Sequence, residues 1–224
     1  PFAQIMQISE NSFCKHSDYV CSLLPYAKEY LMEHGMQEEK FFSITNGIVE
    51  EEWEHSEKLP QDLQGLLDNL HRENRFIIGF FGSHTKSYNL DYLIEAIAEC
   101  KQDIVAVFVG CGNYKNHLIN LAKKTEAEVH FYDPIPKNTI PTFISNVDVS
   151  YVSAVDNSMF KYGISMNKLF DAMMGGKPIL YAVNAPNNYI VDYQCGISVK
   201  PADKKALVEG INFLSEMPEY DRLQ

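Results

Sequence analysis

Residues 162–180 read Tyr-Gly-Ile-Ser-Met-Asn-Lys-Leu-Phe-Asp-Ala-Met-Met-Gly-Gly-Lys-Pro-Ile-Leu, a glycine turn, a short helix and a buried strand in succession. Ser165 is a suitable N-cap for a helix over Met166–Met174. The pair Gly175 and Gly176 ends this helix, and an apolar strand follows over Ile179–Val183. A turn, a helix and a strand in this order form one unit of an α/β fold.

The start of this predicted helix suits an anion. Free backbone N–H groups at Gly163, Ile164 and Ser165 are expected to point toward a phosphate, together with the positive end of the helix dipole. Lys168, one turn into the helix, adds a full positive charge. The alternative is an ordinary loop-to-helix junction that binds nothing.

The same alternation runs outward from this stretch, beginning at Arg75. Short apolar runs predict strands at Phe76–Phe81, Ile104–Val109, Val129–Tyr132, Val147–Val152, Ile179–Val183 and Ile197–Lys200. Amphipathic stretches predict helices at Asn89–Lys101, Tyr114–Lys124, Thr139–Ser145, Met166–Met174, Asn187–Tyr193 and Ala202–Glu216. Apolar strands separated by helices indicate an α/β fold with a Rossmann-like parallel sheet and helices on both faces.

Glycine-containing turns follow three of the predicted strands. They contain Gly82, then Gly110 and Gly112, then Gly163. All three turns lie at the carboxyl ends of parallel strands, where such sheets bind their ligands. We therefore expect a ligand site at this edge of the sheet.

The first part of the chain has a different organisation. Strands are expected at Asp18–Leu24 and Phe41–Ile44, with a helix between them at Pro25–His34. Residues 1–46 are therefore interpreted as the remnant of a preceding α/β domain, and 76–224 as a ligand-binding domain. Residues 47–75 are acidic and poor in apolar side chains, so we expect a solvated linker with one helix near Gln61–Leu70. Because the chain begins within this pattern and without Met, we expect it to be a fragment.

Composition excludes several classes of protein. A net charge of −11 argues against nucleic-acid binding, which needs clustered Lys and Arg. The 5 cysteines show no Cys-x-x-Cys spacing, so reduced thiols and a cytoplasmic location are expected. The histidines show no metal-ligand spacing, and we expect no metal. No apolar run approaches the ~20 residues that a membrane span needs.

These elements together resemble the C-terminal half of a retaining glycosyltransferase of the GT-B, group 1 (family 4 like) type. The matching motifs are Ile44–Ile48, Gly79–His84, Asn89–Ala96, Phe108–Gly112, Ile140–Phe143, Val147–Asp148 and Tyr162–Leu180. The form Tyr-Gly-Ile-Ser-x-Asn-Lys-Leu-Phe-Asp is similar to that of bacterial O-antigen and capsule transferases of the fucosamine-transferase kind.

The resemblance implies two Rossmann-like domains with catalysis between them. Residues 76–224 would bind a nucleotide-diphosphate sugar, which is a substrate and not a cofactor. Residues 1–46 would be the C-terminal remnant of the domain that binds a saccharide or lipid-linked acceptor. The enzyme would act in surface polysaccharide biosynthesis, in the cytoplasm, with peripheral membrane contact through the missing N-terminal domain. The catalytic residues of the missing half cannot be named.

The resemblance also implies residue roles at the first glycine turn. Gly82, Ser83 and His84 match a phosphate-facing turn. Ser83 stands where many relatives have Arg, and a family Lys falls at about Tyr88, so Lys86 is expected to substitute. The alternative for His84 is a polar loop residue bonded to nearby backbone.

At the stretch 162–180, Asp171 matches the acidic residue that contacts the nucleotide ribose. The first acidic position of the family falls on Gly163, so no mechanism that needs that carboxylate is expected. Gly163, Ile164 and Ser165 match the backbone cradle for the diphosphate or the sugar. Asn167 and Lys168 match contacts to the sugar or the phosphate, although Lys168 is alternatively a solvated surface lysine.

The nucleotide base is expected near the loops that follow two neighbouring strands. Gly110 and Gly112 would allow close backbone approach, and Tyr132 and Pro134 would face the base. Tyr132 is alternatively a core residue. Two other functions remain open: a nucleotide-sugar 2-epimerase, which shares this architecture, and a non-catalytic nucleotide-sugar binding module.

Overall fold

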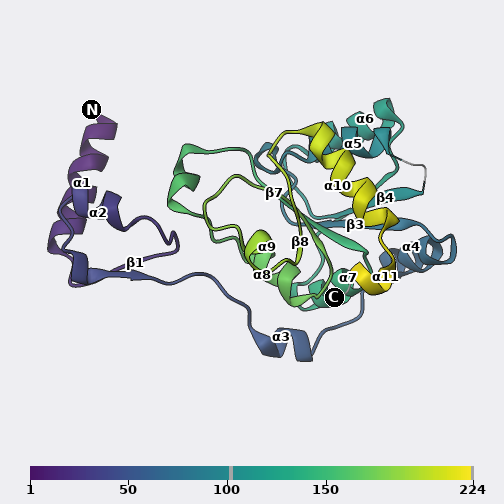
Figure 1. Cartoon of the computed structure of the whole chain (residues 1–224), viewed down its shortest axis with the longest axis horizontal. Helices are drawn as coiled ribbons and strands as arrows, with labels where there is room; N and C mark the ends of the chain where they lie inside the picture. The colour runs from purple at the N-terminus through teal and green to yellow at the C-terminus, as the bar shows by residue number, and fades with distance from the viewer. Residues whose placement is uncertain (101–102, 223–224) are drawn as a thin grey trace. The chain divides into compact units, whose positions relative to one another are not determined.

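The computed structural model describes residues 1–100 and 103–222, and the chain divides into two compact units (Figure 1). Unit 1 comprises residues 1–47, 157–166 and 185–187. Unit 2 comprises the described part of 48–156, 167–184 and 188–224. Each unit is considered by itself below.

Unit 2 contains a six-stranded parallel sheet in the order β5-β4-β3-β6-β7-β8. Its strands are β3 (Phe76–Phe81), β4 (Ile104–Val109), β5 (Val129–Tyr132), β6 (Val149–Ser153), β7 (Ile179–Ala182) and β8 (Gly196–Ser198). All residues of β3 and β4 are buried, which explains why both strands read as unbroken apolar runs. The predicted α/β fold class is confirmed.

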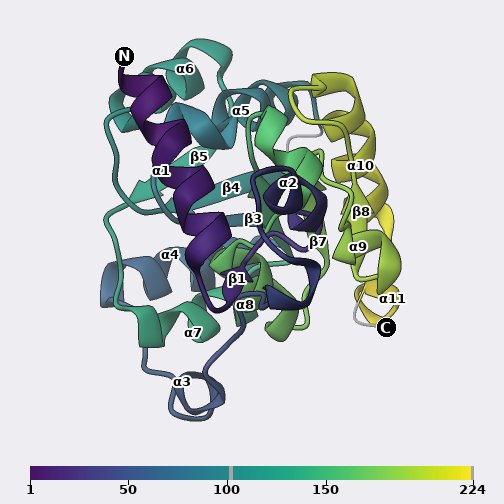
Figure 2. The ribbon, with the colours of Figure 1, turned by 90° about the vertical axis from the view of Figure 1, so that its left-hand side faces the viewer.

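Helices cover both faces of this sheet (Figure 2). On one face, α5 (Leu90–Glu99), α6 (Lys115–Thr125) and α10 (Lys204–Glu216) bury their apolar sides against the sheet. On the other face, α4 (Gln61–Arg72) and α7 (Ile140–Ser145) do the same. Successive residues of β3 alternate between the two cores, so that Ile78 packs in the first and Ile77 in the second.

The strand order reverses between β3 and β6. The chain continues from β3 outward to β4 and β5, whereas β6 continues outward to β7 and β8 on the other side. The two central strands pair at Ile78 with Val149 and at Gly79 with Ser150. Such a reversal leaves a crevice beyond the carboxyl ends of the central strands.

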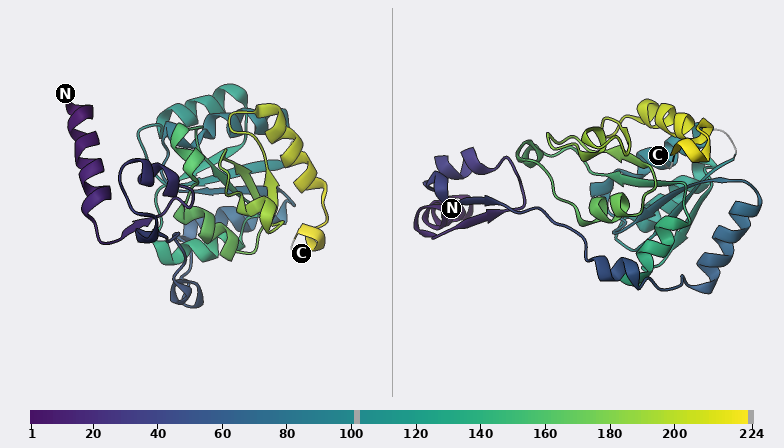
Figure 3. Two further views of the ribbon diagram at one scale, coloured as in Figure 1. Left: turned by 60° about the vertical axis from the view of Figure 1, so that its left-hand side comes forward. Right: turned by 60° about the horizontal axis from the view of Figure 1, so that its bottom comes forward.

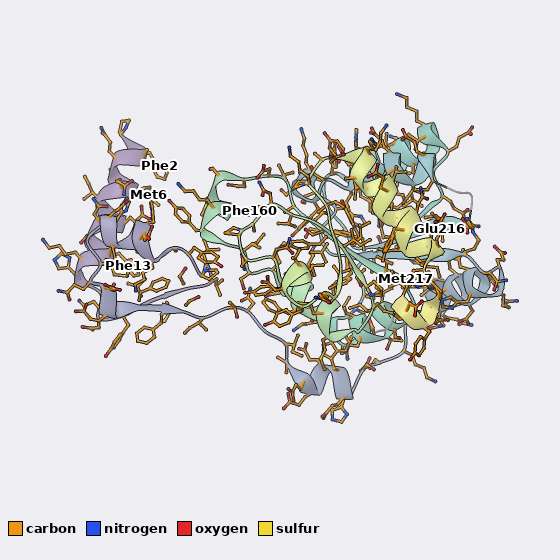
Figure 4. The ribbon with its side chains drawn as sticks, in the orientation of Figure 1. Phe2, Met6, Phe13, Phe160, Glu216 and Met217 are labelled. Atoms are coloured by element: carbon orange, nitrogen blue, oxygen red, sulfur yellow. The ribbon has the colours of Figure 1, made fainter. Side chains whose placement is uncertain are left out.

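Unit 1 is small and contains a two-stranded parallel sheet. The strands β1 (Val20–Ser22) and β2 (Phe41–Ser43) pair in register, and α1 (Phe2–His16) and α2 (Lys28–Glu33) accompany them (Figure 3). Its core cluster contains the buried side chains of Cys14, Val20 and Met36. Phe2, Met6 and Phe13 on α1 are exposed (Figure 4).

The remaining elements are short. They are η1 (Glu38–Lys40), α3 (Glu50–Glu54), η2 (Lys86–Tyr88), η3 (Lys137–Thr139), η4 (Ser158–Tyr162), α8 (Asn167–Met174), α9 (Tyr189–Asp192) and α11 (Glu219–Arg222). The helix predicted over Asn89–Lys101 begins at Leu90 and ends at Glu99, and its predicted last residue lies outside the described residues.

The structure differs from the sequence prediction in three respects. The helix α1 was not predicted, because most of its apolar side chains are exposed and only Cys14 is buried. In the segment 47–75 the predicted helix is present as α4, but the segment is not a solvated linker, because Leu63 and Leu67 of this helix are fully buried in the core of unit 2. Residues 157–166 and 185–187, predicted within the second domain, belong to unit 1.

Candidate functional site

A cavity of about 480 Å³ opens at the carboxyl edge of the unit 2 sheet. The loops after β3, β4 and β5 and the first two turns of α8 line it. It therefore lies where the strand order reverses, the position at which open parallel sheets bind ligands.

The side chain of Lys168 lines this cavity. Its Nζ atom is shielded from solvent and has no hydrogen-bond partner in the part of the chain that the structure describes. Nζ lies 3.5 Å from the centre of the Tyr88 ring and 4.4 Å from that of the Phe80 ring. Burial lowers the Lys168 pKa to about 7, because the charged form loses hydration. The amine thus lacks the counter-ion that an anionic ligand would supply.

Glycine at position 82 makes room for this amine. Gly82 has a φ of +136°, a region that side-chain-bearing residues rarely adopt. A Cβ atom there would lie 2.7 Å from Lys168 Nζ and 3.3 Å from its Cε atom. The end of β3 can therefore approach the amine closely because residue 82 has no side chain.

Asp171 lines the same cavity from the next turn of α8. Burial raises the pKa of this carboxyl, and the charge of Lys137 acts in the opposite direction. Lys137 also lines the cavity, and its Nζ lies 2.7 Å from Glu52 Oε2 on α3. A half-buried carboxylate beside a cation suits hydrogen bonds from hydroxyl groups.

Lys115 fixes the loops that follow β4 and β5. Its Nζ donates hydrogen bonds to the carbonyl oxygens of Tyr132 at 2.9 Å and Gly110 at 3.2 Å. It also contacts Asp133 Oδ1 at 2.8 Å. One side chain at the start of α6 therefore holds two neighbouring strand ends together at the rim of the cavity.

Seven of the residues predicted for the site line this cavity together. They are Gly82, Ser83, Gly110, Pro134, Asn167, Lys168 and Asp171. They come from three loops and one helix, so the fold brings together positions that are up to 89 residues apart in the sequence, from Gly82 to Asp171. Their predicted ligand contacts stay predictions.

His84 was predicted to face a phosphate, but its ring does not line the cavity. The side chain is fully buried, with ring centres 6.0 to 6.1 Å from those of Phe80, Phe108 and Phe131. Burial, followed by the charges of Lys115 and Lys168, lowers the His84 pKa to about 4. Neither ring nitrogen has a hydrogen-bond partner among the described residues. The ring is therefore a neutral part of the core, and not the bonded loop residue that was the alternative.

Three other predicted residues also lie outside the cavity lining. Lys86 is exposed on η2. A Cβ at Gly112 would lie 2.2 Å from the carbonyl oxygen of His84, so this glycine serves the contact between two loops. The Tyr132 hydroxyl lies 3.4 Å from the carbonyl oxygen of Asp62 and its ring packs with the α4 side of the core.

The expected cradle of free N–H groups is contradicted at two of its three positions, Gly163 and Ile164. In unit 1, the Gly163 N–H donates to the carbonyl oxygen of Phe160 at 2.9 Å. The Ile164 N–H donates to Asn187 Oδ1 at 2.9 Å, and Ser165 Oγ accepts the N–H of Asn46 at 2.8 Å. These groups stabilise the loop itself, and α8 begins at Asn167, one residue later than predicted.

Two classes of feature are not found among residues 1–100 and 103–222. No group of three or more His, Cys, Asp and Glu side chains is placed to hold a metal ion. No helix in these ranges combines the length and apolarity that crossing a bilayer requires.

Sequence reasoning missed Tyr88, Lys115 and Lys137 as parts of the site or its support. For Lys115 a signal existed, because a lysine at the start of a helix opposes the helix dipole and needs a partner. For Tyr88 and Lys137 the local sequence offers no signal, since their importance comes from side chains on α8 and α3.

Comparison with known proteins gives a family and a fold. The model of the family "Glycosyl transferases group 1" matches residues 68–223. No curated protein matches the chain. Among solved structures, Anabaena Alr3699/HepE in complex with UDP and glucose is similar over 95% of this chain and 57% of its own, at 20% identity and a TM-score of 0.75.

Two further structures share the fold. A glycosyltransferase from Rickettsia africae ESF-5 is similar over 98% of this chain and 59% of its own, at 16% identity and a TM-score of 0.73. WaaG, a glycosyltransferase involved in lipopolysaccharide biosynthesis, is similar over 91% of this chain and 55% of its own, at 19% identity and a TM-score of 0.68. The chain thus spans less than two thirds of the length of each of these structures.

Proposed function

This chain belongs to the group 1 glycosyl transferases, and we propose that its unit 2 binds the nucleotide-diphosphate sugar from which the whole enzyme transfers a sugar. The proposed acceptor is a saccharide or a lipid-linked saccharide, and the proposed process is surface polysaccharide biosynthesis in the cytoplasm. The role of WaaG in lipopolysaccharide biosynthesis supports this process. Retention at the anomeric carbon is part of the same proposal and rests on the resemblance to the family as a whole. Similarity to transferases of the fucosamine-transferase kind rests on the sequence motif at 162–180.

The observation that carries the proposal is the amine of Lys168. The Lys168 side chain lines the cavity, and its Nζ atom is shielded from water and has no hydrogen-bond partner among the described residues. A diphosphate would supply the missing counter-ion and charge-assisted hydrogen bonds, which are stronger than those between neutral groups. The amine also lies in the first turn of α8, where the helix dipole favours an anion.

Asp171 and the loops after β4 and β5 would hold the nucleoside. The Asp171 carboxylate, one turn beyond Lys168, can accept hydrogen bonds from both ribose hydroxyls. Pro134 and Gly110 line the part of the cavity formed by the two loops that Lys115 ties together. The UDP bound to HepE makes uracil the first base to test.

The same groups would assist the transfer. As the bond between the sugar and the diphosphate breaks, negative charge grows on the leaving diphosphate. An ammonium at that point would stabilise this charge in the transition state. Lys168 is the residue to which we assign this role.

Calorimetric titration of the full chain with UDP, GDP and ADP tests the proposal. We expect one of them to bind, and Lys168→Ala and Asp171→Ala to weaken binding at least about tenfold each, the loss of one charged partner. Lys123→Ala and Asp192→Ala, which remove exposed charges outside the cavity, are the matched controls and should bind like the parent.

Two results would contradict the proposal. One is the absence of binding by all three nucleotides. The other is binding that both cavity variants leave unchanged, which would mean that the nucleotide occupies another part of the molecule. Analysis of products from the whole enzyme, as transferred sugar or as free sugar epimer, separates a transferase from an epimerase.

A further inference from the structure

Among the residues that the structure describes, the Lys168 amine has two aromatic faces near it and no acidic partner. Nζ lies 3.5 Å from the ring centre of Tyr88 and 4.4 Å from that of Phe80. Both distances are within the range in which a ring face attracts a cation. The Tyr88 side chain lines the cavity beside the amine, whereas Phe80 is fully buried in the core.

In the described part of the chain, no charged or titratable group near this amine pairs with it. On the loop after β3, His84 is neutral near pH 7 because burial holds its pKa near 4. On η3, Lys137 carries a like charge and is paired with Glu52. On α8 itself, Asp171 lines the cavity, and its carboxyl responds to Lys137 and Glu52. Burial is the cause of the lowered pKa of Lys168. The ring faces of Tyr88 and Phe80 therefore support the ammonium form, and Tyr88 is the nearer of the two.

Tyr88 is held in place by the backbone around it. Its carbonyl oxygen accepts a hydrogen bond from the hydroxyl of Ser153 at the end of β6. The carbonyl oxygen of the preceding Ser87 accepts the N–H of Val155 at 2.8 Å. These bonds tie η2 to the end of β6, so the loop that carries the Tyr88 ring is anchored across the point where the strand order reverses.

We propose that Tyr88 is a positioning residue of this site, whose ring face holds the Lys168 ammonium in the cavity until an anion binds. Tyr88 acts through Lys168 and needs no contact with the ligand. The inference rests on the proposed function, since it assigns the ring a role in binding the diphosphate of a nucleotide. It also explains how a shielded amine remains available as a cation without a carboxylate that would compete with the ligand.

The first test needs no ligand. Selective isotope labelling of lysine Cε and Nζ allows the titration of Lys168 to be followed by NMR, with Lys168→Met identifying its signal. We expect Tyr88→Leu and Tyr88→Met to lower the Lys168 pKa by about half a unit to one unit, the shift that corresponds to one cation–π contact. Tyr88→Phe keeps the ring and should leave the titration within about 0.2 unit of the wild type, because the attraction belongs to the ring face.

The second test measures binding of inorganic pyrophosphate to the full chain between pH 6 and pH 8.5. Each affinity is divided by that of Lys168→Met at the same pH, so that the titration of the probe cancels. We expect the wild-type ratio to fall as the pH rises through about 7, because the neutral amine does not attract an anion. In Tyr88→Leu and Tyr88→Met this affinity ratio should begin to fall at a lower pH, with affinity about twofold to fivefold weaker at pH 7, because a smaller fraction of the amine is charged.

Controls separate the possible failures. Tyr114→Leu removes an aromatic ring that stacks on His117 and does not line the cavity, so it should change neither readout. If Lys168→Met binds pyrophosphate like the wild type, the proposed diphosphate site itself is wrong. A different result would overturn only the role of Tyr88. In that case Lys168→Met weakens pyrophosphate binding, but the Tyr88 variants leave the Lys168 pKa unchanged or raise it.

Discussion

At the scale of single residues, His84 shows how position changes the meaning of a residue type. Its place in a glycine turn predicted a polar ligand contact. In the structure its backbone joins two loops, since the His84 N–H donates to Cys111 and its carbonyl oxygen accepts the N–H of Tyr114. The ring that follows this backbone enters a cluster of three phenylalanines. The backbone hydrogen bonds between the two loops therefore determine that the His84 side chain points into the core.

The burial of His84 predicts a dependence of stability on pH. The His84 pKa is about 4 in the folded chain and 6.5 in its ordinary state, so between these values only the unfolded chain binds the proton. The free energy of unfolding should therefore fall as the pH drops from 6.5 to 4, by up to about 3 kcal/mol from this residue. His84→Leu should remove this part of the dependence, as measured by urea unfolding at pH 7.5 and 4.5.

The exposed His71 provides the control for this experiment. The variant His71→Leu keeps the buried imidazole and should keep the pH dependence of the wild type. If the free energy of unfolding depends on pH equally in the wild type and in His84→Leu, the His84 ring binds protons as readily in the folded chain as in the unfolded chain. This result would contradict the burial of the ring in the structure.

At the scale of elements, the bounds of the strands were predicted more accurately than the conformation of the loops that follow them. The bounds of β3, β4 and β5 match the apolar runs residue for residue. The fully buried strands β3 and β4 are apolar throughout, so their length is visible in the sequence. The loops at the carboxyl ends of these strands follow no such rule, and their shape depends on ties such as that of Lys115.

Removal of this tie should destabilise unit 2. Lys115→Met leaves the carbonyl oxygens of Gly110 and Tyr132 without this donor, and we expect a loss of about 1–3 kcal/mol in the free energy of unfolding. Asp133→Asn removes a partner whose side chain is 92% exposed to solvent, and it should destabilise the chain less than Lys115→Met does. Urea unfolding of the two variants compares the effects. An equal cost for both would mean that the ion pair, and not the bonds to the backbone, supplies the stability.

At the scale of the whole molecule, the two units differ in the core that supports them. Unit 1 has a core cluster of three buried side chains, whereas the two clusters of unit 2 cover both faces of a six-stranded sheet. A small core allows local opening at low free energy. Unit 1 is therefore expected to unfold locally at a lower free energy than unit 2.

Hydrogen exchange measured by mass spectrometry tests this expectation. Peptides that contain β1 and β2 should exchange at least about tenfold faster than peptides that contain β3 and β4, because the opening free energy differs by more than about 1.4 kcal/mol. Peptides from α4 should exchange slowly with the second group, since this helix is buried in unit 2. Slow exchange of β1 and β2 would show that unit 1 has a stability that its core does not explain.

The sequence by itself determined the α/β class, the order of the elements from Arg75 onward and the edge of the sheet at which the cavity lies. These follow from the periodicity of apolar residues and from the glycine turns, which act over short distances along the chain. It also placed Lys168 and Asp171 one turn apart on one helix, because that spacing is local.

Only the tertiary structure decided the surroundings of these residues. It placed Tyr88 against the Lys168 amine, Lys137 beside Asp171, and His84 in the core. It also showed that hydrogen bonds within unit 1 occupy the N–H groups of Gly163 and Ile164. These contacts join residues from different elements, and whether a polar group is paired, shielded or open to a ligand depends on the side chains that folding brings to it.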